Sequence, residues 1–311
     1  MSIISINNPL LTVFTPLYNR RETLKRTYNS LCRQTSKNFL WLIIDDGSTD
    51  GVFEDIQSWQ QADNGFEIRY IYKENGGMHT SHNTAYENID TELNTCIDSD
   101  DYMPDNAVEL IEKCWNDNRD KGFAGIIGLD FADNTKRVIG KELPTDKNSI
   151  TLTGYYACGG VGDKKLVYRT DIIKNTPPYP VFDGEKYVSL STKYTIIDQD
   201  YELVILNENL CFVEYQLDGS STNMFRQYTR NPKGFTWFRK FQMGYCRSLK
   251  ETFRICTHYV ADAKLAGYKR IVKDSPKKAV TIFAYLFGTA LYVYIKRKSK
   301  SSYLKIEGTK T

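Results

Sequence analysis

The chain has 311 residues, enough to bury a sizeable core as one large domain with an appendage or as two modest domains. Hydrophobic residues make up 41% and charged residues 25%, the composition of an ordinary globular protein, which excludes an intrinsically disordered chain. The formal net charge is only +3, and the seven cysteines form no C-x-x-C pair. Reduced thiols are therefore favoured over a structural zinc site or a disulfide framework.

Apolar strand-like runs alternate with helical segments through residue 101. The strand-like runs occupy 10–16, 39–51, 66–77 and 93–101, and segments with apolar residues at helical spacing fill 17–34, 52–61 and 79–89. This alternation predicts an α/β fold whose sheet is mostly parallel and flanked by helices. Ligands of such sheets bind at the carboxyl ends of the strands.

The pattern changes near residue 125 and again after 231–234. Shorter β-like pieces, among them GIIGLDF, SITLTGYYA and KKLVYRT, predict a mixed extension of the same sheet. The chain then becomes helical and basic, so we expect a first domain over 1–222 and a basic helical C-terminal region over 223–311. Because residues 45–101 are acid-rich, this asymmetry indicates an anionic partner for the C-terminal part, either phosphate-bearing or a membrane surface.

One apolar run, AVTIFAYLFGTALYVYI at 279–295, carries no charge and is flanked by SPKK and KRKSKSS. A membrane span needs about 20 apolar residues, so this run is borderline for crossing a bilayer. Its tyrosines and flanking cations predict a helix at, or dipping into, an anionic membrane face. The alternative is a buried C-terminal helix of a soluble protein.

The acid-rich run CIDSDDYMP at 96–104 predicts a ligand site. No G-x-G-x-x-G follows the first strand and no G-x-x-x-x-G-K-[ST] occurs, which argues against a dinucleotide site and a P-loop. Asp98, Asp100 and Asp101 would repel one another unless a cation or a proton intervenes. Asp98 and Asp100, at i and i+2 of an extended segment, can face one Mg²⁺ or Mn²⁺ that completes its shell with substrate phosphates. A solvated acidic turn is the alternative, and Asp101 is expected to support the site.

Two other groups of residues lie at strand ends. Asp45-Asp46 closes the second strand, where a carboxylate can accept a hydrogen bond from a sugar hydroxyl or a base N–H, or can cap a helix. Gly76-Gly77 permits close approach of a ligand to the backbone just before a helix, whose N-terminus favours phosphate. His79 could bind a metal, but with no third histidine nearby, capping or phosphate hydrogen bonding is favoured.

Four blocks in order carry a family resemblance: TPLYNR (15–20), LIIDDGSTD (42–50), ENGGMHTSHN (74–83) and DSDDYMPD (98–105). Together they resemble the nucleotide-diphospho-sugar-binding half of family-2 glycosyltransferases. Later segments such as GDKKLVYRTDIIKN and CFVEYQLDGSSTN are similar to a bacterial subgroup of cell-surface polysaccharide enzymes. The resemblance implies a GT-A-type, Rossmann-like sheet and an inverting transfer of a sugar from a nucleotide donor, usually a UDP sugar, to an acceptor hydroxyl.

The resemblance also implies a role for each residue at a matching position. Asp46 would accept a hydrogen bond from the uracil ring N–H, Asp100 would bind the metal, and Asp98 would be shared between metal and ribose. The other donor-binding residues would be Thr15, Pro16 and Tyr18 at the base, Gly77, His79 and Ser99 near the ribose and diphosphate, and, in a loop that closes over the phosphates, Arg226, Arg230 and Lys233.

The implied general base is where the chain departs from the family. The base is an acid just after a GEK-like segment, and that position in GEKYVSLSTKY falls on Leu190, which cannot accept a proton. Either the register shifts locally and Glu185, or next Asp183, serves, or another acid such as Asp198 reaches in. Otherwise the chain binds a donor but transfers poorly.

These expectations combine into a glycosyltransferase of the hexosyl or N-acetylhexosaminyl class that depends on Mn²⁺ or Mg²⁺. Its acceptor would be a lipid-linked or growing cell-surface glycan, and its place the inner face of the cytoplasmic membrane as a peripheral protein. The alternative raised by Leu190 is a weakly active or non-catalytic donor-binding partner of another glycosyltransferase. A nucleotidyltransferase would show a Gly-rich basic loop where this chain has TPLYNRRE, and the acidic crevice argues against nucleic acid as a partner.

Overall fold

The computed structural model describes residues 8–214 and 224–307, with side chains through Ser299. The chain divides into two compact units: unit 1 comprises Met1–Pro178 and Lys193–Tyr215, and unit 2 comprises Tyr179–Thr192 and Gln216–Thr311. The expected domain limits of 1–222 and 223–311 stay a prediction. The structure adds that the segment 179–192 clusters with the C-terminal helices.

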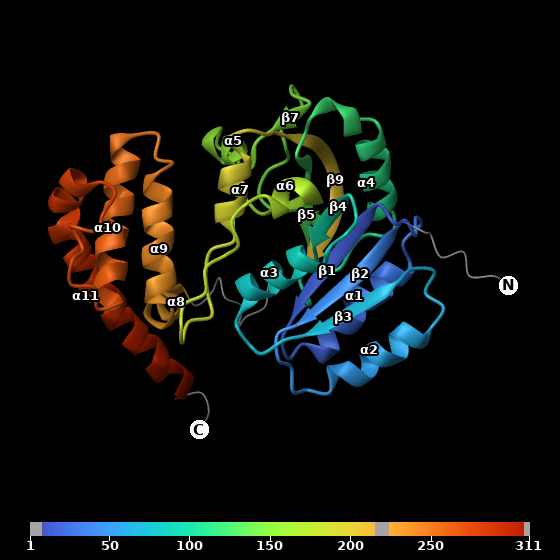
Figure 1. The fold of residues 1–311 in the computed structure, drawn as a ribbon, viewed down its shortest axis with the longest axis horizontal. Coiled ribbons are helices and arrows are strands. Elements are labelled where there is room, and N and C mark those ends of the chain that lie inside the picture. Colours follow the sequence, from blue (N-terminus) through green and yellow to red (C-terminus); the bar gives the residue numbers. More distant parts are fainter. Residues whose placement is uncertain (1–7, 215–223, 308–311) are drawn as a thin grey trace. The chain divides into compact units, whose positions relative to one another are not determined.

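Unit 1 begins with parallel strands, as the alternation of apolar strands and helices predicts. The elements are β1 (Leu11–Leu17), α1 (Arg21–Cys32), β2 (Phe39–Asp45), α2 (Val52–Gln61), β3 (Ile68–Tyr72), α3 (Met78–Asn88) and β4 (Leu93–Cys96). β1 lies between β2 and β4, and β3 lies beyond β2 (Figure 1). Every residue of β1 and β2 is buried, because helices cover both faces of this part of the sheet.

The second part of the sheet is mixed, as expected from the shorter β-like pieces. Its strands are β5 (Gly125–Ala132), β6 (Arg137–Val138), β7 (Ser149–Ile150), β8 (Lys164–Arg169) and β9 (Leu203–Val213). β8 runs antiparallel to both β4 and β5, whereas β9 runs parallel to β5. The strand order is β3-β2-β1-β4-β8-β5-β9-β7, with β6 beside β5. β8 therefore joins the parallel part of the sheet, at β4, to the mixed part, at β5.

One helix of unit 1 lies in a stretch that is expected to be β-like. The helical elements after β4 and before residue 200 are α4 (Ala107–Asn116), the 3₁₀ turn η1 (Arg119–Lys121), α5 (Leu152–Ala157), α6 (Thr170–Lys174) and α7 (Ser191–Ile197), of which α7 begins in unit 2 and continues into unit 1. The stretch SITLTGYYA is expected to be β-like, but it is strand only at Ser149–Ile150. Thr151 ends the strand because its hydroxyl oxygen accepts a hydrogen bond from the Gly154 N–H at 2.9 Å and caps α5.

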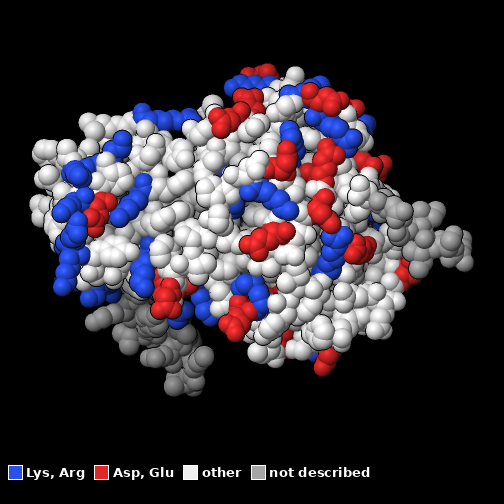
Figure 2. All heavy atoms as spheres, viewed as in Figure 1, with Lys and Arg blue, Asp and Glu red and all other residues white. Residues whose placement is uncertain are grey.

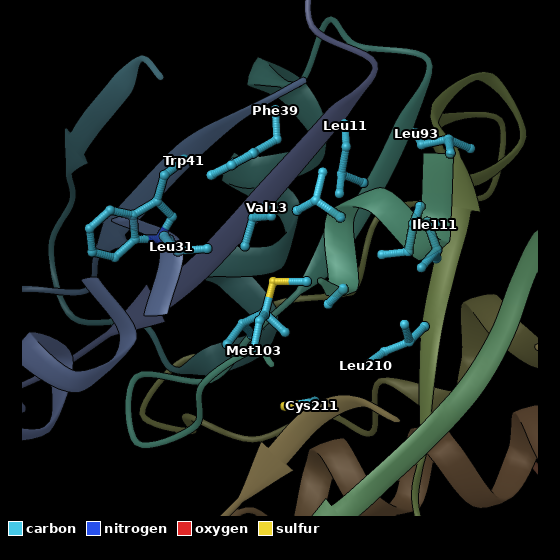
Figure 3. Close-up of a cluster of buried hydrophobic side chains, with 14 of the residues drawn as sticks. Leu11, Val13, Leu31, Phe39, Trp41, Leu93, Met103, Ile111, Leu210 and Cys211 are labelled. Carbon is cyan, nitrogen blue, oxygen red and sulfur yellow. The ribbon is translucent and has the colours of Figure 1, made fainter. Parts of the chain in front are cut away.

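A hydrophobic cluster joins the parallel strands to α1 and α4. Figure 3 shows Leu11 and Val13 of β1 beside Phe39 and Trp41 of β2, with Leu31 of α1 facing them. All five side chains are 2% exposed or less. Full burial of such a side chain contributes about 1.5–3 kcal/mol, so this part of the sheet is a firm platform for the loops at its carboxyl edge.

Unit 2 is built mainly from helices, as expected for the C-terminal region. They are α8 (Met224–Arg230), α9 (Pro232–Met243), α10 (Leu249–Leu265) and α11 (Lys278–Glu307). Its own hydrophobic cluster includes Met243 of α9, Cys256 and Tyr259 of α10 and Ala284 of α11. One stretch of α11, Lys278–Ser299, is long and apolar enough to cross a membrane by length and composition.

Candidate active site

The candidate site lies at the carboxyl edge of the parallel strands of unit 1. β1 and β2 end together, since Leu17 pairs with Asp45, and Phe14 of β1 pairs with Cys96 at the end of β4. The segments that follow these strands begin at Tyr18, Asp46 and Ile97. The structure therefore brings the blocks 15–20, 42–50 and 98–105 to one edge of the sheet. The fourth block, 74–83, is held at the same edge by hydrogen bonds from the Gly76 and Gly77 N–H groups to Asp46.

Asp46 fastens the glycine turn that precedes α3. Its Oδ1 accepts hydrogen bonds from the Gly76 N–H at 2.8 Å and from Lys73 Nζ at 2.5 Å. Its Oδ2 accepts from the Gly77 N–H at 2.7 Å and from Asn75 Nδ2 at 3.2 Å. The side chain is buried, so these four donors surround its carboxylate. The expected bond from Asp46 to a uracil N–H stays a prediction, and such a ligand would have to share these oxygens.

Two glycines allow this close packing. Gly77 has φ +93°, and Gly47 has φ +86°, a region that side chains rarely adopt. A Cβ on Gly47 would lie 3.0 Å from the Asn75 backbone nitrogen. The turn and the loop after β2 are thus pressed together, which explains why both resemblance blocks contain glycine.

Asp45 has a structural role beside Asp46. It is 1% exposed, and its Oδ2 accepts a hydrogen bond from Tyr70 Oη at 2.7 Å. Its Oδ1 accepts from the Ser48 N–H at 2.8 Å and fixes the loop after β2. Asp45 is therefore bonded to β3 and to its own loop.

The three residues expected at a base differ in their surroundings. Thr15 is fully buried, and its hydroxyl oxygen accepts a hydrogen bond from Trp41 Nε1 at 3.0 Å, within the core. Pro16 is buried in β1, whereas the Tyr18 side chain is 49% exposed at the end of that strand. Of these three, Tyr18 offers an accessible ring, the kind of surface on which a base stacks.

The acid segment after β4 contains carboxyl groups of two kinds. Asp98 and Asp100 are half-buried, while Ser99 and Asp101 are buried. Burial, followed by the charge of Asp98, raises the pKa of Asp101 to about 8 and also raises that of Asp100. Asp101 Oδ1 accepts a hydrogen bond from the Glu214 N–H at 3.2 Å, which fits its expected supporting role.

Lys165 supplies a positive charge beside these acids. Its Nζ lies 3.7 Å from Asp130 Oδ1 and donates to the Cys96 carbonyl oxygen at 3.2 Å. Burial alone would lower the pKa of Lys165, but the charges of Asp130, Asp101 and Asp98 outweigh burial and raise it well above the usual value. Lys165 is therefore an ammonium ion inside unit 1. The sequence does not predict this role, because nothing in KKLVYRT shows which lysine of β8 faces the acids.

Asp98 and Asp100 have the chemistry to hold a divalent cation. Two carboxylates at one strand end suit Mg²⁺ or Mn²⁺, which takes the rest of its oxygen shell from water and phosphate. The raised pKa of Asp100 shows that burial and Asp98 oppose its negative charge, which a bound cation would relieve. Within residues 8–214 and 224–307, no three His, Cys, Asp or Glu side chains are grouped as a complete metal site. The donor set thus fits a cation shared with a substrate.

His79 stands in the first turn of α3, directly after the glycine turn. It is 1% exposed, and neither ring nitrogen has a hydrogen-bond partner among the described residues. Burial lowers its pKa to about 4, so the ring is neutral at pH 7. His82, one turn further on, is bonded at Nδ1 to Tyr86 Oη at 3.2 Å and belongs to the core. His79 therefore keeps hydrogen-bonding capacity at the carboxyl edge of the sheet.

The candidates for the general base are divided between the two units. Glu185 belongs to unit 2, where its Oε1 and Oε2 accept hydrogen bonds from the Lys233 and Gly234 N–H groups, each at 2.8 Å. These contacts anchor the first turn of α9. Asp183 is exposed, and Leu190 is half-buried. Asp198 caps α5, since its Oδ2 accepts from the Thr153 N–H at 2.7 Å. The identity of the base stays a prediction.

The three cations expected in a phosphate-closing loop lie in unit 2. Arg226 and Arg230 belong to α8, and Lys233 lies in the first turn of α9. The expected loop is therefore helical at these three positions. Pro232 suits the first position of α9, where a missing backbone N–H costs no hydrogen bond. Residues 215–223, which precede α8, lie outside the described chain. A role for the three cations at a phosphate stays a prediction.

The chain belongs to glycosyl transferase family 2, whose family model matches residues 12–175. That range contains all four resemblance blocks, and it makes the chain a member of an enzyme family of the GT-A fold, as the sequence predicts.

Individual relatives match a smaller part. Glycosyltransferase GlyA of Streptococcus pneumoniae is 34% identical over 103 residues, which are 33% of this chain and 14% of that protein. The putative teichuronic acid biosynthesis glycosyltransferase TuaG of Bacillus subtilis is 32% identical over 101 residues, 32% of this chain and 40% of that protein. The chain thus spans less than half the length of these curated relatives.

Solved structures share the fold. TarS 1–349 of S. aureus in complex with UDP-GlcNAc is 14% identical, with a TM-score of 0.57 over 94% of this chain and 92% of that one. The mannosyltransferase PcManGT from Pyrobaculum calidifontis, in complex with GDP-Man and Mn²⁺, is 14% identical, with a TM-score of 0.51 over 91% of this chain and 87% of that one. At this identity the likeness concerns the fold alone.

Proposed function

We propose that the protein is an inverting, metal-dependent glycosyltransferase that moves a sugar from a nucleotide diphosphate donor, with UDP as the nucleotide, to an acceptor hydroxyl. The observation that carries the proposal is the carboxyl edge of unit 1. There a glycine turn held by Asp46, a buried His79 whose ring nitrogens have no hydrogen-bond partner among the described residues, and the half-buried pair Asp98 and Asp100 occur in one family-2 chain. The structures bound to UDP-GlcNAc and to GDP-Man with Mn²⁺ support this donor chemistry for the fold.

In this mechanism the protein's own groups prepare the donor. Tyr18 offers a stacking face for the base, and the Gly76-Gly77 turn lets the sugar-diphosphate approach the backbone. Neutral His79 donates or accepts one hydrogen bond at the ribose or diphosphate. Asp98 and Asp100 would hold the divalent cation, which supplies charge neutralisation to the departing diphosphate when bound. The positive charge of Lys165 offsets part of the negative charge of the acid segment and so reduces the cost of burying it.

Inversion requires a base that deprotonates the acceptor hydroxyl as it attacks the anomeric carbon. We retain Glu185 and Asp183 as the candidates. They are separable by experiment, because the Glu185 carboxylate also anchors α9 whereas the Asp183 side chain is exposed. Glu185→Gln removes the charge and keeps the size of the side chain, but its NH2 group replaces one of the two oxygens that accept from α9, so its stability must be measured beside its activity. Asp183→Asn removes the charge in the exposed loop. If both variants retain full transfer at normal stability, neither residue is the base.

The acceptor that we propose is a lipid-linked or growing cell-surface glycan. The named function of TuaG, teichuronic acid biosynthesis, and that of WcaA of Escherichia coli, putative colanic acid biosynthesis, support this class. We place this acceptor at the cytoplasmic membrane, because the apolar, cation-flanked α11 suits a peripheral protein on the inner face of that membrane. A partner glycosyltransferase subunit is compatible with the same place of action.

A second function, donor binding without efficient transfer, is favoured by one observation. The base position implied by the family is Leu190. The acid nearest to it in the sequence, Glu185, has both carboxylate oxygens hydrogen-bonded to backbone N–H groups of α9. A donor-binding subunit of this kind would bind nucleotide and metal normally. It would differ from an enzyme only in turnover.

The decisive experiment is thermal unfolding against a panel of nucleoside diphosphates, with and without Mn²⁺, followed by sugar transfer from labelled donors to membranes. A ligand at a hundredfold excess over Kd stabilises the native state by about 2.7 kcal/mol. Asp100→Asn should abolish the Mn²⁺-dependent part of the shift. Asp105→Asn, an exposed aspartate paired with Arg33 just beyond the acid segment, is the matched control and should leave it unchanged.

Three outcomes separate the functions. A shift with UDP and Mn²⁺ together with transfer supports the enzyme. A shift without transfer to any acceptor supports the donor-binding subunit. No shift with any nucleoside diphosphate contradicts both.

A further inference from the structure

The helix α11 carries a continuous apolar stripe on its surface. Ile282, Phe283, Leu286 and Phe287 are 59%, 75%, 76% and 58% exposed. Ala290, Val293 and Tyr294 continue the exposed stripe toward the C-terminus. At about 100° per residue these positions lie within an arc of about 140°. A continuous apolar helix surface of this width is normally buried, so the exposed stripe indicates a surface that binds a partner or a membrane.

The opposite side of α11 is already packed within unit 2. Thr281, Ala284, Gly288 and Ile295 are buried, and they lie across the helix from the stripe. A Cβ on Gly288 would lie 2.5 Å from Val260 Cβ, so α10 and α11 touch at their backbones. Because α11 is packed along one side against α10, only its opposite side is available to a membrane.

A groove opens beside the stripe. It has a volume of about 650 Å³ and is lined by Ser248, Lys250, Glu251, Phe253, Arg254, Thr257, His258 and Phe287. Phe287 belongs both to the groove and to the stripe, and its ring meets Phe253 edge-on at 5.5 Å between centroids. The groove therefore continues the apolar surface of α11 onto α10.

Cationic and polar groups line the other wall of the groove. Lys250, Arg254 and His258 are spaced four residues apart on α10, so they fall on one side of the helix. Lys250 and Arg254 are exposed. The Nδ1 atom of His258 is buried and has no hydrogen-bond partner in the part of the chain that the structure describes. Lys250 and Arg254 together suit a phosphate, to which they offer two accessible positive charges.

Few acids oppose this positive surface. Between 224 and 299 the sequence has three acidic residues, Glu251, Asp262 and Asp274, among many Lys and Arg. Asp262 is fully buried with Arg239 at 3.3 Å, and Glu251 accepts a hydrogen bond from the Arg247 N–H at 3.0 Å. Figure 2 shows blue Lys and Arg side chains spread over α9, α10 and α11, with few red ones among them. Unit 2 thus presents positive charge around an apolar stripe.

We propose that unit 2 docks in the plane of an anionic phospholipid membrane, with the stripe of α11 in the acyl boundary and a lipid headgroup phosphate in the groove of α10. This inference rests on the proposed function for the membrane location and adds the binding face, its orientation and the lipid chemistry. Apolar side chains flanked by cations bind such surfaces through buried apolar area and attraction to anionic lipid together. Lys277 and Lys278 before the stripe, and Lys296 and Arg297 after it, lie where headgroups would be.

The test is sedimentation of the full chain with vesicles of phosphatidylcholine alone and of phosphatidylcholine with phosphatidylglycerol. Wild type should partition to the anionic vesicles, and salt should weaken that binding by screening. Lys250→Ala with Arg254→Ala should weaken it about thirtyfold, since each cation near such a surface contributes on the order of fivefold. Lys121→Ala with Lys147→Ala removes two exposed charges of unit 1 and should change it less than twofold.

The stripe is tested in parallel. Phe283→Gln with Leu286→Gln should weaken partitioning at least tenfold, while the matched pair Phe53→Gln with Tyr201→Gln, at exposed positions of unit 1, should not. Equal losses in the test and control pairs would overturn the proposal, as would equal binding to both vesicle types. Protein that resists extraction by high salt and alkali after binding would show a spanning helix and would also overturn it.

The two proposals fail in distinguishable ways. Stabilisation by UDP with Mn²⁺ should be the same in wild type and in all four paired variants, because none changes the acid segment or the glycine turn. Vesicle binding without nucleotide binding would support the docking face and contradict the proposed glycosyltransferase. Nucleotide binding without vesicle binding does the reverse.

Discussion

The crowded aspartates after β4 become understandable once Lys165 is considered. Three carboxyl groups within four residues repel one another, and the sequence suggests that an external cation or a proton relieves the repulsion. Burial and Asp98 raise the pKa of Asp101 to about 8, so this carboxyl holds a proton at pH 7. In the fold, Lys165 of β8 reaches the same region and bonds to the Cys96 carbonyl. With this ammonium ion in place, the acid segment keeps a net negative charge that suits a divalent cation without being intolerable in its absence.

Lys165→Met is expected to destabilise the metal-free protein by about 3 kcal/mol, because it leaves buried carboxylates without their counter-charge. It should also enlarge the rise in unfolding temperature caused by Mn²⁺, since the added cation then relieves more repulsion. Thermal unfolding with and without Mn²⁺ measures both effects. Lys121→Met, an exposed lysine, is the control. A variant as stable as wild type would show that Lys165 is not the counter-charge.

His79 predicts how the stability of the protein depends on pH. Its pKa is lowered from 6.5 to about 4 by burial, so the folded state binds fewer protons than the unfolded state between these values. Its contribution is therefore complete above about pH 6.5 and is lost as pH falls toward 4. The shift corresponds to about 3 kcal/mol. Urea unfolding from pH 7.5 to 4.5 should show a shallower decline for His79→Gln than for wild type, and parallel declines would refute the assignment.

At the scale of elements, the glycine turn before α3 depends on a side chain from the loop after β2. The backbone N–H groups of Gly76 and Gly77 point at the Asp46 carboxylate instead of at a partner strand. This contact couples the loop after β2 to the N-terminus of α3. Donor binding and the order of the turn should therefore change together.

Asp46→Asn is expected to loosen the turn, because the amide replaces one charged acceptor by a donor that faces N–H groups. Amide hydrogen exchange at Gly76 and Gly77 should accelerate by at least tenfold, and affinity for UDP should fall. Asp63→Asn, at an exposed position after α2, is the control and should alter neither. Faster exchange with unchanged UDP affinity would separate the turn from the donor site.

The elements also show what the sequence can and cannot predict. Apolar runs that stop on acids or glycine give the strands β1 to β4 and their order of helices, because hydrophobic periodicity and turn residues are local signals. The helix α5 is missed because a single Thr151 cap overrides a β-like composition. Lys165 is missed because its role depends on β8 lying against β4, a pairing between residues far apart in the chain. The same distance in sequence hides the contact of Asp46 with its turn.

For the whole molecule, the two units have separate hydrophobic clusters. The cluster of unit 1 joins β1, β2, α1 and α4, and that of unit 2 joins α9, α10 and α11. The proposed donor site lies in unit 1, and the proposed docking face lies in unit 2. Separate cores allow ligands of one unit to leave the stability of the other unchanged.

Calorimetry of the full chain should therefore show two transitions, of which UDP with Mn²⁺ raises only one. The other transition belongs to unit 2. Gly288→Val should lower the free energy of unfolding of unit 2 by about 1–3 kcal/mol, because the valine side chain would enter the contact between α11 and Val260. In that variant the nucleotide-sensitive transition should keep its midpoint and its response to UDP. A single transition that both changes displace would mean that the units unfold as one, and the docking face and the donor site would then be energetically coupled.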